Sequence, residues 1–212
     1  MTVQQIIDTF RTNTDQQDDL TDSEVLALAQ KALDKIYAVR DWIFLTKEAA
    51  GTLDTINTEY SLPTDFANLV DNYDQNANPM TSYRMVGDAR KVLYVGADYQ
   101  PYPFITMAER RKHRNSNGYV YIDFRQDNFV LTKAEQTSRS YEFDYKYRPA
   151  DVTVSDTPAL PGNHTIVAYL MAVLWNDIDM TPKSASYRSE NEYKYEQDLA
   201  DLEYEDAKRK TL

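Results

Sequence analysis

Histidine is the side chain best suited to general acid–base catalysis near neutral pH, and this sequence contains two, His113 and His164. His113 lies within a run of basic residues, and His164 comes just before a strongly apolar stretch. The sequence has no His-x-x-x-His motif, the spacing that places two zinc ligands on one face of a helix. We therefore expect His113 to be a solvated surface residue and His164 to lie in the first turn of a helix.

Carboxylates are the other groups that could act in catalysis. Asp177 and Asp179 end the apolar stretch, but magnesium sites draw carboxylates from several elements, so we expect a polar helix end there. A carboxylate-dependent hydrolase using acids such as Asp123 and Asp144, with or without the help of a metal, is the enzymatic alternative. It predicts divalent-metal binding that is lost on Asp→Asn substitution at these positions. The five glycines are too widely spaced for a phosphate-binding loop, and without cysteine there is no thiolate nucleophile. We expect no enzymatic activity, no metal and no cofactor.

One short segment could bind an anion, because it contains the basic residues Arg110, Arg111, Lys112 and Arg114. The whole chain carries a net charge of −11, so its surface in general repels nucleic acid and anionic lipid. The segment either contacts DNA or an acidic partner locally, or forms the solvated face of a short surface helix over residues 106–114.

The most apolar stretch, residues 166–175, determines how the other elements must be arranged. At about 100° per residue its side chains cover the whole circumference of a helix, so other elements must surround it. Pro161 and Gly162 precede it, and Asn163 is a suitable N-cap. The stretch is shorter than the roughly 20 residues of a membrane span. Residues 158–180 therefore predict the central helix of a soluble core, or a helix held between subunits.

The rest of the chain divides into helical ends and a β-rich middle. Apolar spacing predicts a helix over residues 3–12, and the capping box Thr21–Glu24 begins an amphipathic helix that ends near Arg40. Short apolar or alternating runs follow, with a turn near Gly51 between the first two. We expect strands at residues 42–45, 55–60, 66–73, 83–86, 92–95, 119–124, 129–131 and 141–147, and a linker over 149–157.

The last helix begins near Thr181-Pro182 and has two apolar faces. One face carries Tyr195, Leu199 and Leu202, and the opposite face carries Tyr193, Ala200, Tyr204 and Ala207. One face can pack on the same chain and the other on a different molecule. We predict an interface formed by this helix and the basic segment, with the residues Tyr193, Tyr195, Leu199, Leu202, Tyr204, Arg110, Arg111, Lys112 and Arg114.

The predicted fold class is α+β, a helical bundle built from the N- and C-terminal helices with an inserted antiparallel β-rich domain. The expected domains are residues 1–41 with 158–212 and residues 42–157. The chain is 42% hydrophobic and 27% charged over 212 residues, which is typical of a folded protein. The N-terminus lacks a secretory pattern, so we expect assembly in a reducing cytosol. Seventeen tyrosines against seven phenylalanines favour partly hydrated interfaces.

The order of several segments resembles a known family. These segments are WIFL (42–45), YSLPTDF (60–66), the YVYIDF and FVLT strands, the tyrosine-rich strand that ends YRPA (147–150), and Leu160-Pro161 before the apolar helix. The chain resembles the head-to-tail adaptor proteins of tailed bacteriophages, and it is similar to the tail tubular protein A type of short-tailed phages. The YSLPTDF segment is the most specific of these motifs.

The resemblance implies a structural virion protein, assembled in the host cytoplasm, that forms a ring commonly of twelve copies. Such a ring bridges the portal protein and the tail nozzle, and its helical part surrounds the channel through which DNA passes without specific binding. The β part faces the tail, and no membrane is involved. Two alternatives stay open: another neck or tail-completion protein, and a glycan-binding adhesion module that uses the tyrosine-rich sheet.

Overall fold

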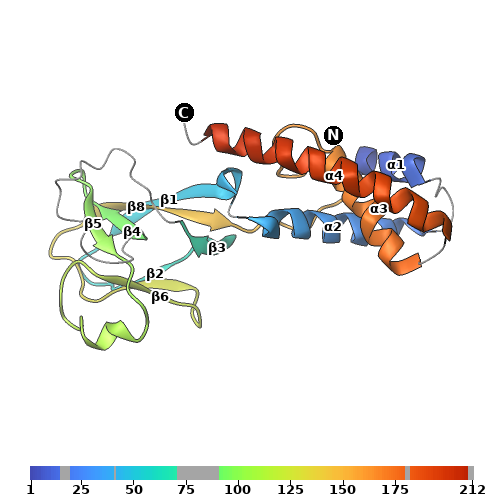
Figure 1. Ribbon diagram of the computed structural model, residues 1–212. Coiled ribbons are helices and arrows are strands. Elements are labelled where there is room, and N and C mark those ends of the chain that lie inside the picture. The colour runs from blue at the N-terminus through green and yellow to red at the C-terminus, as the bar shows by residue number, and fades with distance from the viewer. Residues whose placement is uncertain (15–19, 41, 71–90, 180–181, 210–212) are drawn as a thin grey trace. The chain divides into compact units, whose positions relative to one another are not determined.

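The computed structural model describes residues 1–14, 20–40, 42–70, 91–179 and 182–209 of the chain. The fold is α+β, and these residues include four α-helices and antiparallel sheets (Figure 1). The chain forms two compact units. The helical unit consists of Met1–Leu45 and Pro149–Leu212, and the β unit consists of Thr46–Arg148.

The helical unit contains α1 (Val3–Thr14), α2 (Asp22–Val39), α3 (Thr165–Asp179) and α4 (Pro182–Lys208). The apolar stretch forms α3, as predicted, and α3 packs against each of the other three helices (Figure 1). Most of its described side chains are buried, as Ile166, Val167 and Met171 show with exposed fractions of 1% or less, while Tyr169 and Val173 are half-buried. Three neighbouring helices thus remove from water most of the apolar surface of α3.

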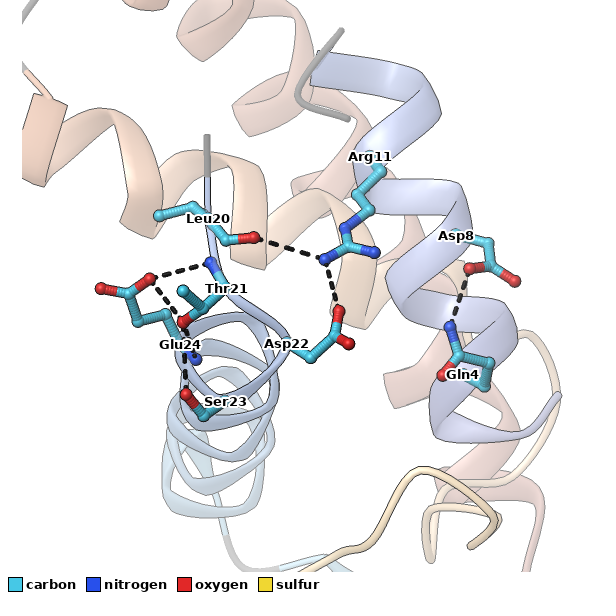
Figure 2. A network of polar contacts seen from close by, with 8 residues as sticks. All are labelled: Gln4, Asp8, Arg11, Leu20, Thr21, Asp22, Ser23 and Glu24. Atoms are coloured by element: carbon cyan, nitrogen blue, oxygen red, sulfur yellow. Dashed lines mark hydrogen bonds and ion pairs between the residues drawn. The ribbon is translucent and has the colours of Figure 1, made fainter. Parts of the chain in front are cut away.

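Polar contacts fix where the first two helices begin. The predicted capping box of α2 is confirmed: the Thr21 amide donates to Glu24 Oε2 at 2.9 Å, and the Glu24 amide donates to Thr21 Oγ1 at 3.4 Å (Figure 2). Arg11 of α1 also reaches the start of α2, where its Nη2 lies 2.8 Å from Asp22 Oδ1. At α1, Val3 and Gln4 donate their amides to carbonyls of residues 156 and 154, so the 149–157 segment caps a helix.

The strand predicted at residues 42–45 and the turn predicted near Gly51 are both wrong. Ile43–Leu45 forms a short 3-10 helix, η1, and not a strand, because Trp42 is buried in the helical unit and its Nε1 donates to the Ile36 carbonyl at 2.7 Å. Gly51 lies inside strand β1 and not in a turn. It is paired with Tyr141, whose ring occupies the space that a Cβ at residue 51 would need.

The described residues of the β unit form two antiparallel sheets. Its strands are β1 (Thr46–Leu53), β2 (Glu59–Ser61), β3 (Phe66–Leu69), β4 (Val92–Val95), β5 (Gln100–Pro103), β6 (Val120–Asp123), β7 (Asn128–Leu131) and β8 (Arg139–Tyr147). The larger sheet has the order β1-β8-β4-β5, with β3 also paired to β8, and the smaller has the order β2-β7-β6. Their shared core centres on Phe129 and Phe143, whose ring centroids are 5.7 Å apart.

Most predicted strands are present, with shifted bounds. The strands expected near 92–95, 119–124, 129–131 and 141–147 are found as β4, β6, β7 and β8. The strand expected at 83–86 lies outside the described residues. The surface helix expected over 106–114 is a single 3-10 turn, η3 (Glu109–Arg111), where Glu109 accepts the Thr106 amide at 3.0 Å.

Candidate interaction surface

One face of α4 packs on its own chain. Leu202 is 5% exposed and Asn191 3% exposed, while Tyr195 and Leu199 are half-buried on the same side. This side faces α3, the helix against which most of α4 packs. Of the five predicted interface residues on α4, three (Tyr195, Leu199 and Leu202) therefore contribute to the folding of this chain.

The opposite face of α4 carries two exposed aromatic residues. Tyr193 is 61% exposed and Tyr204 is 64% exposed. Each ring has a polar neighbour one turn away: Gln197 Nε2 donates to the Tyr193 hydroxyl at 2.7 Å, and Lys208 Nζ lies 4.2 Å from the centroid of the Tyr204 ring. Exposed tyrosines held on a rigid helix are the side chains that protein interfaces favour.

Charged residues flank these tyrosines, and part of that charge is neutralised within the helix. Lys208 pairs with Glu205 at 2.6 Å, and Lys194 pairs with Glu190. The hydrogen bond from each lysine to its glutamate raises the lysine pKa above its ordinary value. Glu196 and Asp201 are exposed and have no ion pair with any described residue. They keep the outer face of α4 acidic.

The end of α4 is attached to the segment that leads out of the helical unit. Asp206 is 1% exposed, and its carboxylate accepts the amide of Ile43 at 2.9 Å and that of Phe44 at 3.0 Å. These amides belong to the start of η1, where Ile43 and Phe44 are half-buried, and Asp206 supplies the acceptor that the start of a helix lacks. Asp206 was not recognised from the sequence, because a contact across 163 residues leaves no local pattern.

His164 is a buried residue whose ring nitrogens contact other parts of the same chain. It is 6% exposed, its Nε2 donates to the Leu160 carbonyl at 2.9 Å, and its Nδ1 lies 3.1 Å from the amino group of Met1. The residue directly precedes α3, close to the expected helix start. Both ring nitrogens are occupied by the chain itself, so His164 links the N-terminus to the beginning of α3.

The predicted basic segment is exposed on the β unit. Arg110, Arg111, Lys112 and Arg114 are all exposed, and none has a carboxylate partner among the described residues. The guanidinium of Arg110 lies 5.9 Å from the ring centroid of Tyr121, and the ring of His113 lies 4.0 Å from that of Tyr119. Four cations in five residues form a local positive patch on an acidic chain.

Asp123 and Asp144 are the two acids considered above for catalysis, and their surroundings differ. Asp123 accepts the Arg125 amide at 3.1 Å in the turn after β6, and burial raises the pKa of Asp144 above its ordinary range, with Glu48 nearby. Within the described residues no group of three His, Cys, Asp or Glu side chains could hold a metal ion. Among the same residues no helix has the length and apolar character to cross a membrane.

A depression in the β unit has a largely polar lining. It has a volume of about 540 Å³ and is lined by Tyr102, Glu135 and Arg139, among others. The Tyr102 hydroxyl donates to Glu135 at 2.8 Å, and burial together with this contact raises the pKa of Tyr102 to about 12. Arg139 binds Asp98 at 2.6 Å and Gln100 at 2.8 Å. Within this lining Tyr102 thus pairs with Glu135, and Arg139 pairs with Gln100.

The exposed tyrosines of α4 and the exposed basic segment are of the kinds that protein interfaces use. The chain matches the SU10 adaptor protein model over residues 1–211, and it belongs to the SU10 adaptor protein family. No curated protein matches the sequence significantly. The family supports a phage adaptor-type structural protein of the virion, and membership of a structural family favours a role without enzymatic activity. The narrower resemblance to the tail tubular protein A type is not confirmed.

Proposed function

We propose that this chain is the subunit of a head-to-tail adaptor ring that joins the portal protein to the tail nozzle. The observation that carries the proposal is the family match, which extends over residues 1–211 and so includes both units. Among such adaptors, we expect this chain to be most similar to the tail tubular protein A type of short-tailed phages. Its copies would assemble in the host cytoplasm before they enter the virion.

The helical unit is proposed to form the ring, as one bundle of N- and C-terminal helices into which the β unit is inserted. A closed ring needs heterologous contacts, in which two different surfaces of each copy meet. Helix α4 supports this role, because its Leu202 side packs on the chain while Tyr193 and Tyr204 face outward. The ring would be commonly of twelve copies, as in the adaptors that the sequence resembles.

The charge of the chain suits a channel through which DNA slides. A net charge of −11 per copy is multiplied around the ring, and it opposes binding to phosphates. Specific DNA binding would require cations along the lining, which would slow the passage of the genome. We propose that DNA passes without specific binding, and that the basic segment 110–114 contacts an acidic surface of a tail or neck protein.

Quantitative mass spectrometry of purified virions tests the proposal. The chain should be present in several copies per particle, at a fixed ratio to the portal protein, and should remain with the neck when tails are removed. A chain that is produced during infection but is absent from purified virions would refute the proposed role.

A further inference from the structure

Two exposed helix faces in the helical unit carry complementary side chains. The outer face of α4 presents Tyr193, Gln197, Ala200 and Tyr204, all exposed and spaced by 4, 3 and 4 residues. The outer face of α2 presents Ala27, Lys31, Asp34 and Ala38, also exposed and with the same spacing. In each helix this stripe lies opposite the buried side. A repeat of 4 and 3 residues keeps a seam of side chains in line along two packed helices.

From these stripes we propose that α4 of one copy packs along α2 of the next copy, a contact that rests on the ring proposed above. The occupant of each face is a second copy of this chain. The large side chains of one stripe face small ones of the other: Tyr193 lies at the level of Ala27, and Tyr204 at the level of Ala38. Between these two levels, Gln197 of one copy lies against Lys31 of the next. Two tyrosines that insert beside alanines would form the buried centre of the contact.

The register of this contact follows from a distance within one copy. Arg40, just after α2, pairs with Glu203 of α4 at 3.4 Å, so the end of α2 lies at the level of residue 203. Both helices run in the same direction within the helical unit (Figure 1). In the proposed ring, the axis is parallel to these helices. Neighbouring copies are then related by rotation about that axis, with no shift along it. Ala38 of one copy therefore comes within about one helical turn of the level of Tyr204 of the next.

Charge complementarity favours the same pairing. On α2, Lys31 and Lys35 are exposed and have no ion pair with any residue that the structure describes. On α4, Glu196 and Asp201 are likewise exposed and unpaired, one on each side of the tyrosine stripe. In two parallel helices, a residue that flanks the contacting stripe meets a residue on the partner helix. That residue lies about five positions beyond the one at its own level. This places Glu196 opposite Lys35.

The remaining charge on the α2 stripe is compatible with the contact. Asp34 lies at the level of Ala200, the smallest residue of the α4 stripe, and it already accepts a hydrogen bond from Gln30 at 2.9 Å. A methyl group opposite Asp34 leaves space for water around the carboxylate, whereas a tyrosine there would desolvate it. The large residues of α4 thus fall at the two levels where α2 has alanine.

Disulfide cross-linking of the full chain tests the register, because the natural sequence contains no cysteine. The matched variant combines Lys31→Cys with Gln197→Cys. The mismatched control combines Lys31→Cys with Ala207→Cys, which displaces the second cysteine by roughly 15 Å along the axis. In virions assembled from these chains, oxidation of the matched variant should give a ladder of linked copies, and the control should give single chains. The thermal unfolding of each reduced variant should match that of the natural chain.

The outcomes separate this inference from the proposed function. A ring in the neck without cross-links in the matched variant overturns the α2–α4 contact and leaves the adaptor role intact. A neck that contains the chain in a single copy overturns both. A charge exchange adds a second test: Lys35→Glu or Glu196→Lys alone should weaken association of copies about fivefold, and both together should restore it. Lys133→Glu on the β unit is the control with the same change of charge, and an equal loss in that variant would contradict the pairing.

Discussion

The carboxylate of Asp206, near the end of α4, accepts the backbone amide of Ile43 at 2.9 Å. It therefore holds the end of α4 against η1, the short helix that directly precedes β1. The carboxylate is almost fully buried, and the Phe44 amide also donates to it at 3.0 Å. One side chain thus ties the helix that carries the proposed interface to the segment where the chain leaves the helical unit.

Asp206→Ala should lower the free energy of unfolding of the helical unit by about 1–3 kcal/mol, because it removes the acceptor of two amides in half-buried positions. Urea denaturation followed by far-UV circular dichroism measures this change. Asp201→Ala, on the exposed side of the same helix, is the control and should alter the free energy by less than about 0.5 kcal/mol. Equal effects of the two substitutions would show that Asp206 has no special structural role.

Gly51→Ala should destabilise the β unit by about 1–3 kcal/mol. A Cβ at this position would lie 2.7 Å from the Tyr141 ring, which packs in turn against Phe129 with centroids 5.1 Å apart. The added methyl group must displace that ring from the aromatic core. Ala50→Ser at the neighbouring exposed position should be nearly neutral. An unchanged urea midpoint for Gly51→Ala would contradict the close packing of β1 against β8.

The β unit should lose stability in acid partly through Asp65. The hydrogen bond from Lys47, at 2.6 Å, lowers the pKa of this carboxyl, and the Tyr145 hydroxyl donates to it as well. Since the pKa is lower in the folded state, Asp65 stabilises the fold above the pKa of the unfolded carboxyl, about 4. That contribution is lost as the pH falls through the folded pKa. Asp65→Asn should be less stable at pH 6 and should show a flatter decline below pH ~4.

Two tyrosines of the β unit should resist ionisation. Burial, together with hydrogen bonds to Glu135 and Asp65, raises the pKa values of Tyr102 and Tyr145 to about 12. Because these tyrosines ionise near pH 10 in the unfolded chain, their contribution to stability is complete below that pH and is lost between about pH 10 and 12. Tyrosinate absorbance at rising pH should show a late component that decreases in Tyr102→Phe. A titration of the natural chain that is complete by pH ~11 would contradict this.

The two faces of α4 should respond differently to a charge. Tyr204→Asp should leave the unfolding midpoint nearly unchanged, because the residue is 64% exposed, but should prevent incorporation into virions. Leu202→Asp should unfold the helical unit, because it buries a carboxylate at a position that is 5% exposed. Chemical denaturation and virion composition measure the two effects separately. Tyr204→Asp virions with normal content of this chain would contradict an outward interface.

Local patterns in the sequence predicted the regular elements of this fold well. The Thr21–Glu24 capping box and the continuous apolar stretch of α3 are local signals that span a few helical turns. The helices that they predicted are present as α2 and α3. The apolar run at Trp42 was misassigned as a strand, because four residues are too few to show a helical or strand period. Its true position depends on a hydrogen bond to Ile36 and on the helices around it.

The candidate surface could be predicted only in outline. The sequence showed two apolar faces on α4 but gave no reason to place Leu202 inside and Tyr204 outside, because that choice depends on where α3 lies. The contacts of Asp206 with Ile43 and of His164 with Met1 join residues that are 163 positions apart. No periodicity extends over such distances, so these contacts emerge only from the three-dimensional fold.

The adaptor role is tested most directly by an electron-microscopic reconstruction of the virion neck at side-chain resolution. We predict a closed ring of copies of this chain between portal and tail, with helical units side by side and Tyr193 and Tyr204 buried between copies. A neck whose ring is built from other proteins, with no density that fits α3 and α4, would contradict the account.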